Sequence, residues 1–88
     1  MASSEAAVRA ASEVGAAKNP QASLQLRLAE EQLAKAKALM ADGDNAEAEL
    51  LLMRAQADAE LALALSREAQ AKADAQATLD QVQKLTKK

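Results

Sequence analysis

Residues 39–47 read LMADGDNAE, and this stretch decides the fold because it interrupts an otherwise helix-favouring sequence. Gly43 suits the left-handed residue that follows the end of a helix. Asp44 suits the N-cap of a following helix, and Glu47 stands three residues later, as in a capping box. The pattern therefore predicts a tight turn at Gly43 between two helices.

The helix after this turn is predicted to run from about residue 45 to about residue 86, because no glycine or proline follows Gly43. At about 1.5 Å per residue it would extend roughly 60 Å. Its first half is apolar on several sides, through Leu50–Met53, Leu61, Leu63 and Leu65. A helix that is wet on one side needs only one apolar stripe, so we expect this half to contact two neighbours.

The helix before the turn is predicted to cover residues 20–41. Asn19 is a favoured N-cap, and Pro20 is of the type favoured at the first helical position. The residue before a proline is also disfavoured in the α conformation, so the chain breaks here. A further, Ala-rich helix is predicted over about residues 4–17, with one of its opening serines as the cap.

These elements predict an all-α fold in a single helical domain over residues 1–88. The favoured architecture is an antiparallel three-helix bundle whose long third helix overhangs the other two beyond about Ala71. The alternative is a long two-helix hairpin kinked at Pro20, because the chain lengths on the two sides of Gly43 are similar. The bundle is favoured because the Leu-rich start of the third helix needs more than one neighbour.

The composition excludes most catalytic chemistry. Histidine, cysteine and all three aromatic types are absent, which removes the usual proton shuttles, thiol nucleophiles, zinc ligands and base-stacking platforms. The net charge of −2 gives no electrostatic case for nucleic acid or an anionic membrane surface. We therefore expect no enzymatic activity, no cofactor and no nucleic-acid partner. No apolar run approaches the roughly 18 residues of a membrane-spanning helix, so the chain as given is expected to be soluble.

Acidic residues crowd the turn and raise the question of a Ca²⁺ site. An EF-hand loop needs its glycine at the sixth position, whereas Gly43 would fall at the second. Helix capping explains the acids better, and no metal site is assigned. The residues assigned to the turn and caps are Asn19, Pro20, Gly43, Asp44 and Glu47.

Small and acidic residues at fixed places give the chain a recognisable frame: Ala10-Ala11, Gly15-Ala16-Ala17, Pro20, Leu33, Ala36, Gly43-Asp44, Ala48 and Ala57-Asp58-Ala59-Glu60-Leu61-Ala62. Over about residues 6–73, this frame resembles a family of Gram-negative bacterial envelope lipoproteins with an Ala-rich helical domain of unknown function. Some members of that family carry a following OmpA-like peptidoglycan-binding domain.

The resemblance implies a periplasmic protein that a lipid anchors to the outer membrane in its full-length form, with no other membrane contact. The signal peptide and lipid-bearing cysteine of that family are missing here, as expected of a trimmed mature form that begins at an added Met1. Because no further domain follows Lys88, peptidoglycan binding is not implied.

The leading functional hypothesis is a non-enzymatic structural, scaffolding or protein-interaction module of the bacterial cell envelope. The alternative is a small helical carrier or sensor of apolar ligands in the periplasm. The sequence does not name the protein partner, but its thin core predicts self-association as a homodimer at micromolar concentration or above. The candidate interaction surface comprises Leu63, Leu79, Val82 and Leu85.

Overall fold

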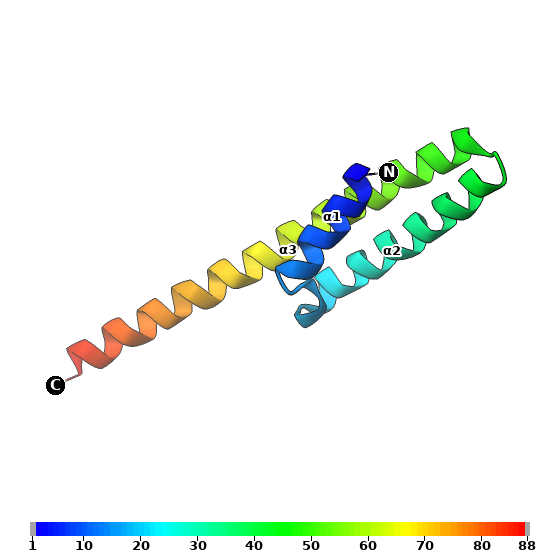
Figure 1. The fold of residues 1–88 in the computed structure, drawn as a ribbon. Coiled ribbons are helices and arrows are strands. Elements are labelled where there is room, and N and C mark those ends of the chain that lie inside the picture. Colours follow the sequence, from blue (N-terminus) through cyan, green and yellow to red (C-terminus); the bar gives the residue numbers. More distant parts are fainter. Residues whose placement is uncertain (1, 88) are drawn as a thin grey trace.

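The computed structural model describes residues 2–87, apart from the side chain of Ala17, and within them the chain is helical with no strand. The elements are α1 (Ala2–Glu13), a short 3-10 helix η1 (Ala16–Lys18), α2 (Pro20–Ala41) and α3 (Asn45–Thr86). The molecule is a rod of 70 × 18 × 15 Å, because α3 runs along nearly its whole length (Figure 1). The predicted three-helix arrangement with a long third helix is confirmed.

Helices α2 and α3 form an antiparallel hairpin, and α1 lies across it with more contact to α3 than to α2 (Figure 1). The chain therefore folds back at η1 instead of continuing as one kinked arm. The two-helix alternative is wrong for this reason. Helices α2 and α3 have the predicted bounds.

Helix α1 ends earlier than predicted, at Glu13 and not at residue 17. Gly15 takes a left-handed conformation with φ of 82°, which stops the helix, and its backbone N–H donates to the carbonyl of Ser12 at 3.1 Å. A glycine just past the last periodic residue is the usual mark of a helix C-terminus. Gly15 carries this signal in the sequence, four residues after Ala11.

Asn19 starts α2 through its side chain. Its Oδ1 accepts hydrogen bonds from the backbone N–H groups of Gln21, at 3.0 Å, and Ala22, at 3.2 Å. These bonds satisfy two of the donors that a helix start leaves without partners. Pro20 occupies the first turn, where its missing N–H costs nothing.

The turn at Gly43 is a Schellman motif. Gly43 has φ of 86°, its N–H donates to the Met40 carbonyl at 3.1 Å, and the Asp44 N–H donates to the Leu39 carbonyl at 2.8 Å. The predicted capping box does not form, because the Asp44 side chain accepts no hydrogen bond from the first turn of α3. Its ψ of 62° lies outside the extended region that N-caps adopt. Its N–H is already engaged with Leu39, so Glu47 has no free donor to reach there.

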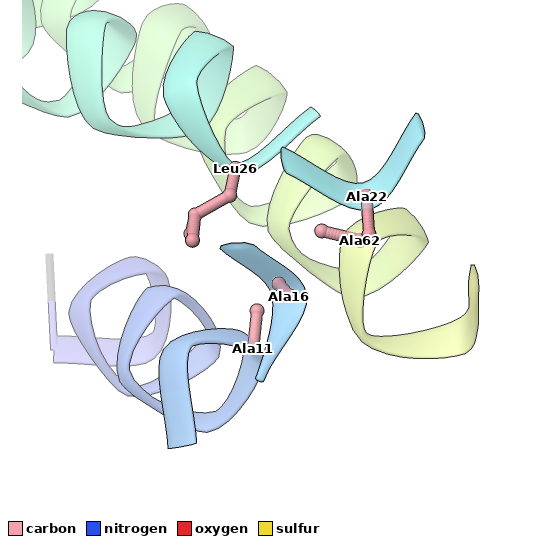
Figure 2. Packing of buried hydrophobic residues seen from close by; sticks show 5 residues of the cluster. All are labelled: Ala11, Ala16, Ala22, Leu26 and Ala62. Atoms are coloured by element: carbon pink, nitrogen blue, oxygen red, sulfur yellow. The ribbon is translucent and has the colours of Figure 1, made fainter. Parts of the chain in front are cut away.

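The core is a seam of alanines. Among the apolar residues that the described chain buries, Leu26 is the one large side chain and the rest are alanines: Ala11, Ala16, Ala22, Ala29, Ala36, Ala48, Ala55, Ala59 and Ala62. Figure 2 shows five members of the central cluster (Ala11, Ala16, Ala22, Leu26 and Ala62), contributed by α1, η1, α2 and α3. Small side chains let the three helices approach closely, and the larger apolar residues lie at the edges of the seam.

Two polar contacts hold α1 on the hairpin. The buried Ser4 hydroxyl donates to the backbone carbonyl of Leu52 on α3 at 2.9 Å. The Lys37 ammonium on α2 lies 3.2 Å from a Glu5 carboxylate oxygen. Because α1 starts at Ala2, Ser4 lies inside the helix and ties it to α3, a role different from the expected N-cap.

Beyond the bundle, α3 continues alone (Figure 1). Every described residue from Arg67 to Lys87 is exposed. The overhang thus begins slightly earlier than the predicted Ala71. It is a helix of about five turns, and only its start, within residues 68–72, borders hollows beside η1 and the first turn of α2.

Candidate interaction surface

The predicted surface residues separate into two groups. Leu63 is half-buried and packs against the central core cluster, so it belongs to the inner side of α3. Leu79, Val82 and Leu85 lie together on the overhang and are 50–76% exposed. The structure therefore assembles three of the four residues and removes Leu63 from the candidate surface.

The overhang residues lie on one side of α3. Val82 is three residues from both Leu79 and Leu85, a spacing that places side chains on one face of a helix. Ala71 and Ala75 continue that side toward the bundle. We call these five exposed residues the overhang stripe.

A second apolar stripe lies on the part of α3 that belongs to the bundle. It consists of six exposed residues at helical spacing, which we call the body stripe: Ala46, Leu50, Met53, Ala57, Leu61 and Ala64. Its three large side chains are 46–64% exposed. The sequence indicated that this half of α3 was apolar on several sides. Both predicted neighbours, α1 and α2, contact α3, and the body stripe is the apolar side that they leave uncovered.

The inner side of α3 explains why the body stripe is uncovered. The residues that α1 and α2 bury on α3 are Ala48, Ala55, Ala59, Ala62 and Ser66. At 100° per residue these lie on the side opposite the body stripe. Helix α3 is therefore apolar on two opposite faces, and the bundle covers one of them.

The acidic residues of the hairpin turn do not form a recognised metal site. Asp42, Asp44 and Glu47 are all exposed. Among residues 2–87, no group of three or more acidic side chains is arranged to hold a metal ion. The turn acts structurally, through Gly43 and its backbone hydrogen bonds.

A hollow of about 400 Å³ lies on the exposed overhang beside Gln81, Lys84 and Leu85, and a smaller one of about 270 Å³ lies between η1 and α3. Both are open to solvent, and the walls of the smaller one include Glu13, Lys18, Asn19 and Gln70. A carrier of apolar ligands needs an enclosed and mostly apolar cavity. Neither hollow provides one, so the carrier hypothesis stays a prediction without structural support.

None of the described helices combines the length and the apolar composition needed to cross a bilayer.

Comparison with known proteins gives one match. The family model described as a domain of unknown function, DUF4398, matches residues 1–83, nearly the whole chain. No curated protein matches the chain, and no solved structure does.

Proposed function

This chain belongs to the DUF4398 family of domains of unknown function, and from that premise we propose that it is a non-enzymatic scaffolding or protein-interaction module of the bacterial cell envelope. The resemblance of its Ala-rich frame to Gram-negative envelope lipoproteins supports the location. In this proposal the full-length protein is held at the periplasmic face of the outer membrane by a lipid. The helical domain extends from that anchor.

The observation that carries the proposal is the overhang stripe. An isolated helix of this length is marginal in water, because helices gain most of their stability from packing an apolar face. The overhang has such a face, and nothing else in the described chain covers it. Exposed apolar surface of this kind is typical of protein-binding sites, and a helix is commonly recognised through residues at three- and four-residue spacing.

The bundle supports this role by holding the overhang out from the rest of the molecule. Helix α3 is anchored along its inner alanine seam, and α1 is fixed on it through Ser4. A continuous helix then carries this order into the overhang with no glycine or proline to interrupt it. The result is a projecting helical binding element.

The test is affinity capture from a Gram-negative envelope extract with three versions of the chain. The wild type should retain a partner, and Val82→Asp should lose it, because the substitution places a charge in the overhang stripe. Ala73→Asp is the matched control, since Ala73 is exposed on the opposite side of the same helix. Equal capture by both variants, or no capture by the wild type, would contradict the proposal.

A further inference from the structure

The body stripe and the overhang stripe, except for Leu85, form one continuous face. Successive members are three or four residues apart over almost the whole of α3: Ala46, Leu50, Met53, Ala57, Leu61, Ala64, Glu68, Ala71, Ala75, Leu79, Val82 and Thr86. All twelve are exposed. The average spacing is close to the 3.6 residues of a helical turn, so the face runs straight for roughly 60 Å. We call it the outer stripe.

One charged residue interrupts the outer stripe. Glu68 lies near its middle, and its carboxylate is 3.0 Å from the Lys72 ammonium one turn further along. Lys72 lies at the edge of the stripe, so the ion pair can keep the Glu68 carboxylate turned toward solvent. Of the other eleven residues, ten are apolar, and the eleventh is Thr86 at the end of the helix.

We propose that two copies of the chain pair antiparallel through their outer stripes, about a two-fold axis near Ala64. The overhang of each copy then covers the body stripe of the other. The inference rests on the proposed function, since it takes α3 as the binding element, and it names a second copy of this chain as the partner.

The lengths of the two halves of α3 favour a second copy. The part of α3 within the bundle spans residues 45–66, and the overhang spans residues 67–86. An antiparallel pair centred near Ala64 therefore overlaps over nearly the full helix. Leu79 comes level with the partner's Leu50, and Ala75 with the partner's Met53. The first pairing sets two leucines against each other and the second sets a small side chain against a large one, so apolar side chains meet apolar ones in both.

The charges at the two ends of the hairpin favour the antiparallel orientation. The turn end carries Asp42, Asp44 and Glu47, whereas the free end of α3 carries Lys84 and Lys87. Antiparallel pairing brings the lysines of one copy to the level of the partner's acidic turn. Parallel pairing would bring like charges together at both ends, which is unfavourable.

Charges beside the outer stripe agree with the position of the axis. Glu60 and Arg67 lie on one flank and are both exposed. Glu60 precedes the axis position and Arg67 follows it by nearly the same number of residues, so antiparallel pairing sets Glu60 beside the partner's Arg67. The two-fold axis repeats this contact. On the other flank, Lys72 falls between the partner's Asp58 and the partner's Arg54 and adds no net attraction.

The area is sufficient for a stable dimer. If each of the twelve residues of the outer stripe loses on the order of 50 Å² of accessible surface, the two copies bury roughly 1,200 Å² together. A specific interface should exceed roughly 1,000 Å². The contact therefore reaches the size of a specific interface without aromatic anchors.

Sedimentation equilibrium tests the pairing, because an elongated shape does not affect the measured mass. The wild type should approach twice 9.2 kDa at tens of micromolar concentration. Leu79→Asp should raise the dissociation constant at least tenfold, and Ala73→Asp should leave it within twofold. Far-ultraviolet circular dichroism should show the same helix content for all three. A wild-type mass of 9.2 kDa at every concentration would overturn the proposal.

Disulfide cross-linking tests the orientation, since the chain has no native cysteine. Ala64→Cys alone should form a covalent dimer under mild oxidation. Ala46→Cys and Val82→Cys should each stay unlinked alone and become linked when mixed. Efficient self-linking of Ala46→Cys would indicate parallel pairing and overturn the antiparallel arrangement.

The two proposals can fail separately. A chain that stays monomeric yet captures an envelope protein through the overhang stripe would refute self-pairing and leave the proposed function standing. A chain that dimerises as described but captures nothing would support self-pairing and refute a separate protein partner.

Discussion

At the scale of single residues, Gly43 has a conformational role. Its φ of 86° lies in the region where side chains are strained. A Cβ at this position would meet open space, since no atom lies within 4 Å of it. The cost of replacing Gly43 is therefore one of backbone strain and not of crowding.

The substitution Gly43→Val should lower the free energy of unfolding by about 1 kcal/mol or more, because a β-branched residue resists the left-handed conformation. Gly43→Asn is the control and should cost less, since asparagine tolerates that conformation. Urea unfolding followed by circular dichroism measures both. Equal stability of the valine variant and the wild type would show that the turn is not built on this glycine.

Ser4 illustrates a polar residue with a tertiary role. The substitution Ser4→Ala removes the hydroxyl that donates to the Leu52 carbonyl and should cost about 1 kcal/mol. Ser3→Ala is the matched control, because Ser3 is exposed in the same turn of α1 and gains the same helix propensity. The difference between the two midpoints of urea unfolding reports the hydrogen bond. Identical midpoints would mean that α1 is not held in this way.

At the scale of the helices, the alanine seam sets how closely α1, α2 and α3 approach. Every buried apolar residue of α3 in the described chain is an alanine. The leucines of α3 are half-buried beside the seam or exposed, whereas Leu26 of α2 is the one leucine buried within it. Each alanine buries little apolar area. The alanine-rich faces therefore stabilise the bundle through the close packing of the helices.

The substitution Ala59→Leu should destabilise the fold by roughly 1–3 kcal/mol, because the fully buried Ala59 leaves no space for a larger side chain. Ala73→Leu is the control, since it adds the same atoms at an exposed position of α3. Thermal or urea unfolding compares the two. If the seam accepts the leucine of Ala59→Leu with no loss of stability, the helices are not packed as closely as described.

At the scale of the whole molecule, the bundle and the overhang should differ in local stability. Amides protected only by a single exposed helix open more readily than those under tertiary cover. In the Leu79→Asp variant, residues 71–87 should therefore exchange hydrogen before residues 50–65. In the wild type at a concentration that favours the dimer, the overhang should gain protection. Equal protection of both segments in a proven monomer would contradict the open overhang.

The sequence by itself determined where α2 and α3 begin and end and where the chain turns between them. Glycine, proline and the Asn19 cap act within a few residues, so their effect does not depend on the rest of the fold. Gly15 gives the same local signal and ends α1 at Glu13, before the predicted end at about residue 17. The overhang was likewise foreseeable, since α3 is far longer than its neighbours.

Only the tertiary structure decided which face of α3 is inside. The helix has apolar residues on opposite sides, so its sequence pattern permits either face to meet α1 and α2. Close approach of three helices favours the face with alanines at Ala55, Ala59 and Ala62, and this choice turns Leu50, Met53 and Leu61 outward. It also explains why Leu63 packs against the core, whereas Leu79 is exposed because it lies on the overhang, where α1 and α2 do not reach. Packing depends on the partner surfaces as well as on the helix itself, and periodicity along one helix does not contain that information.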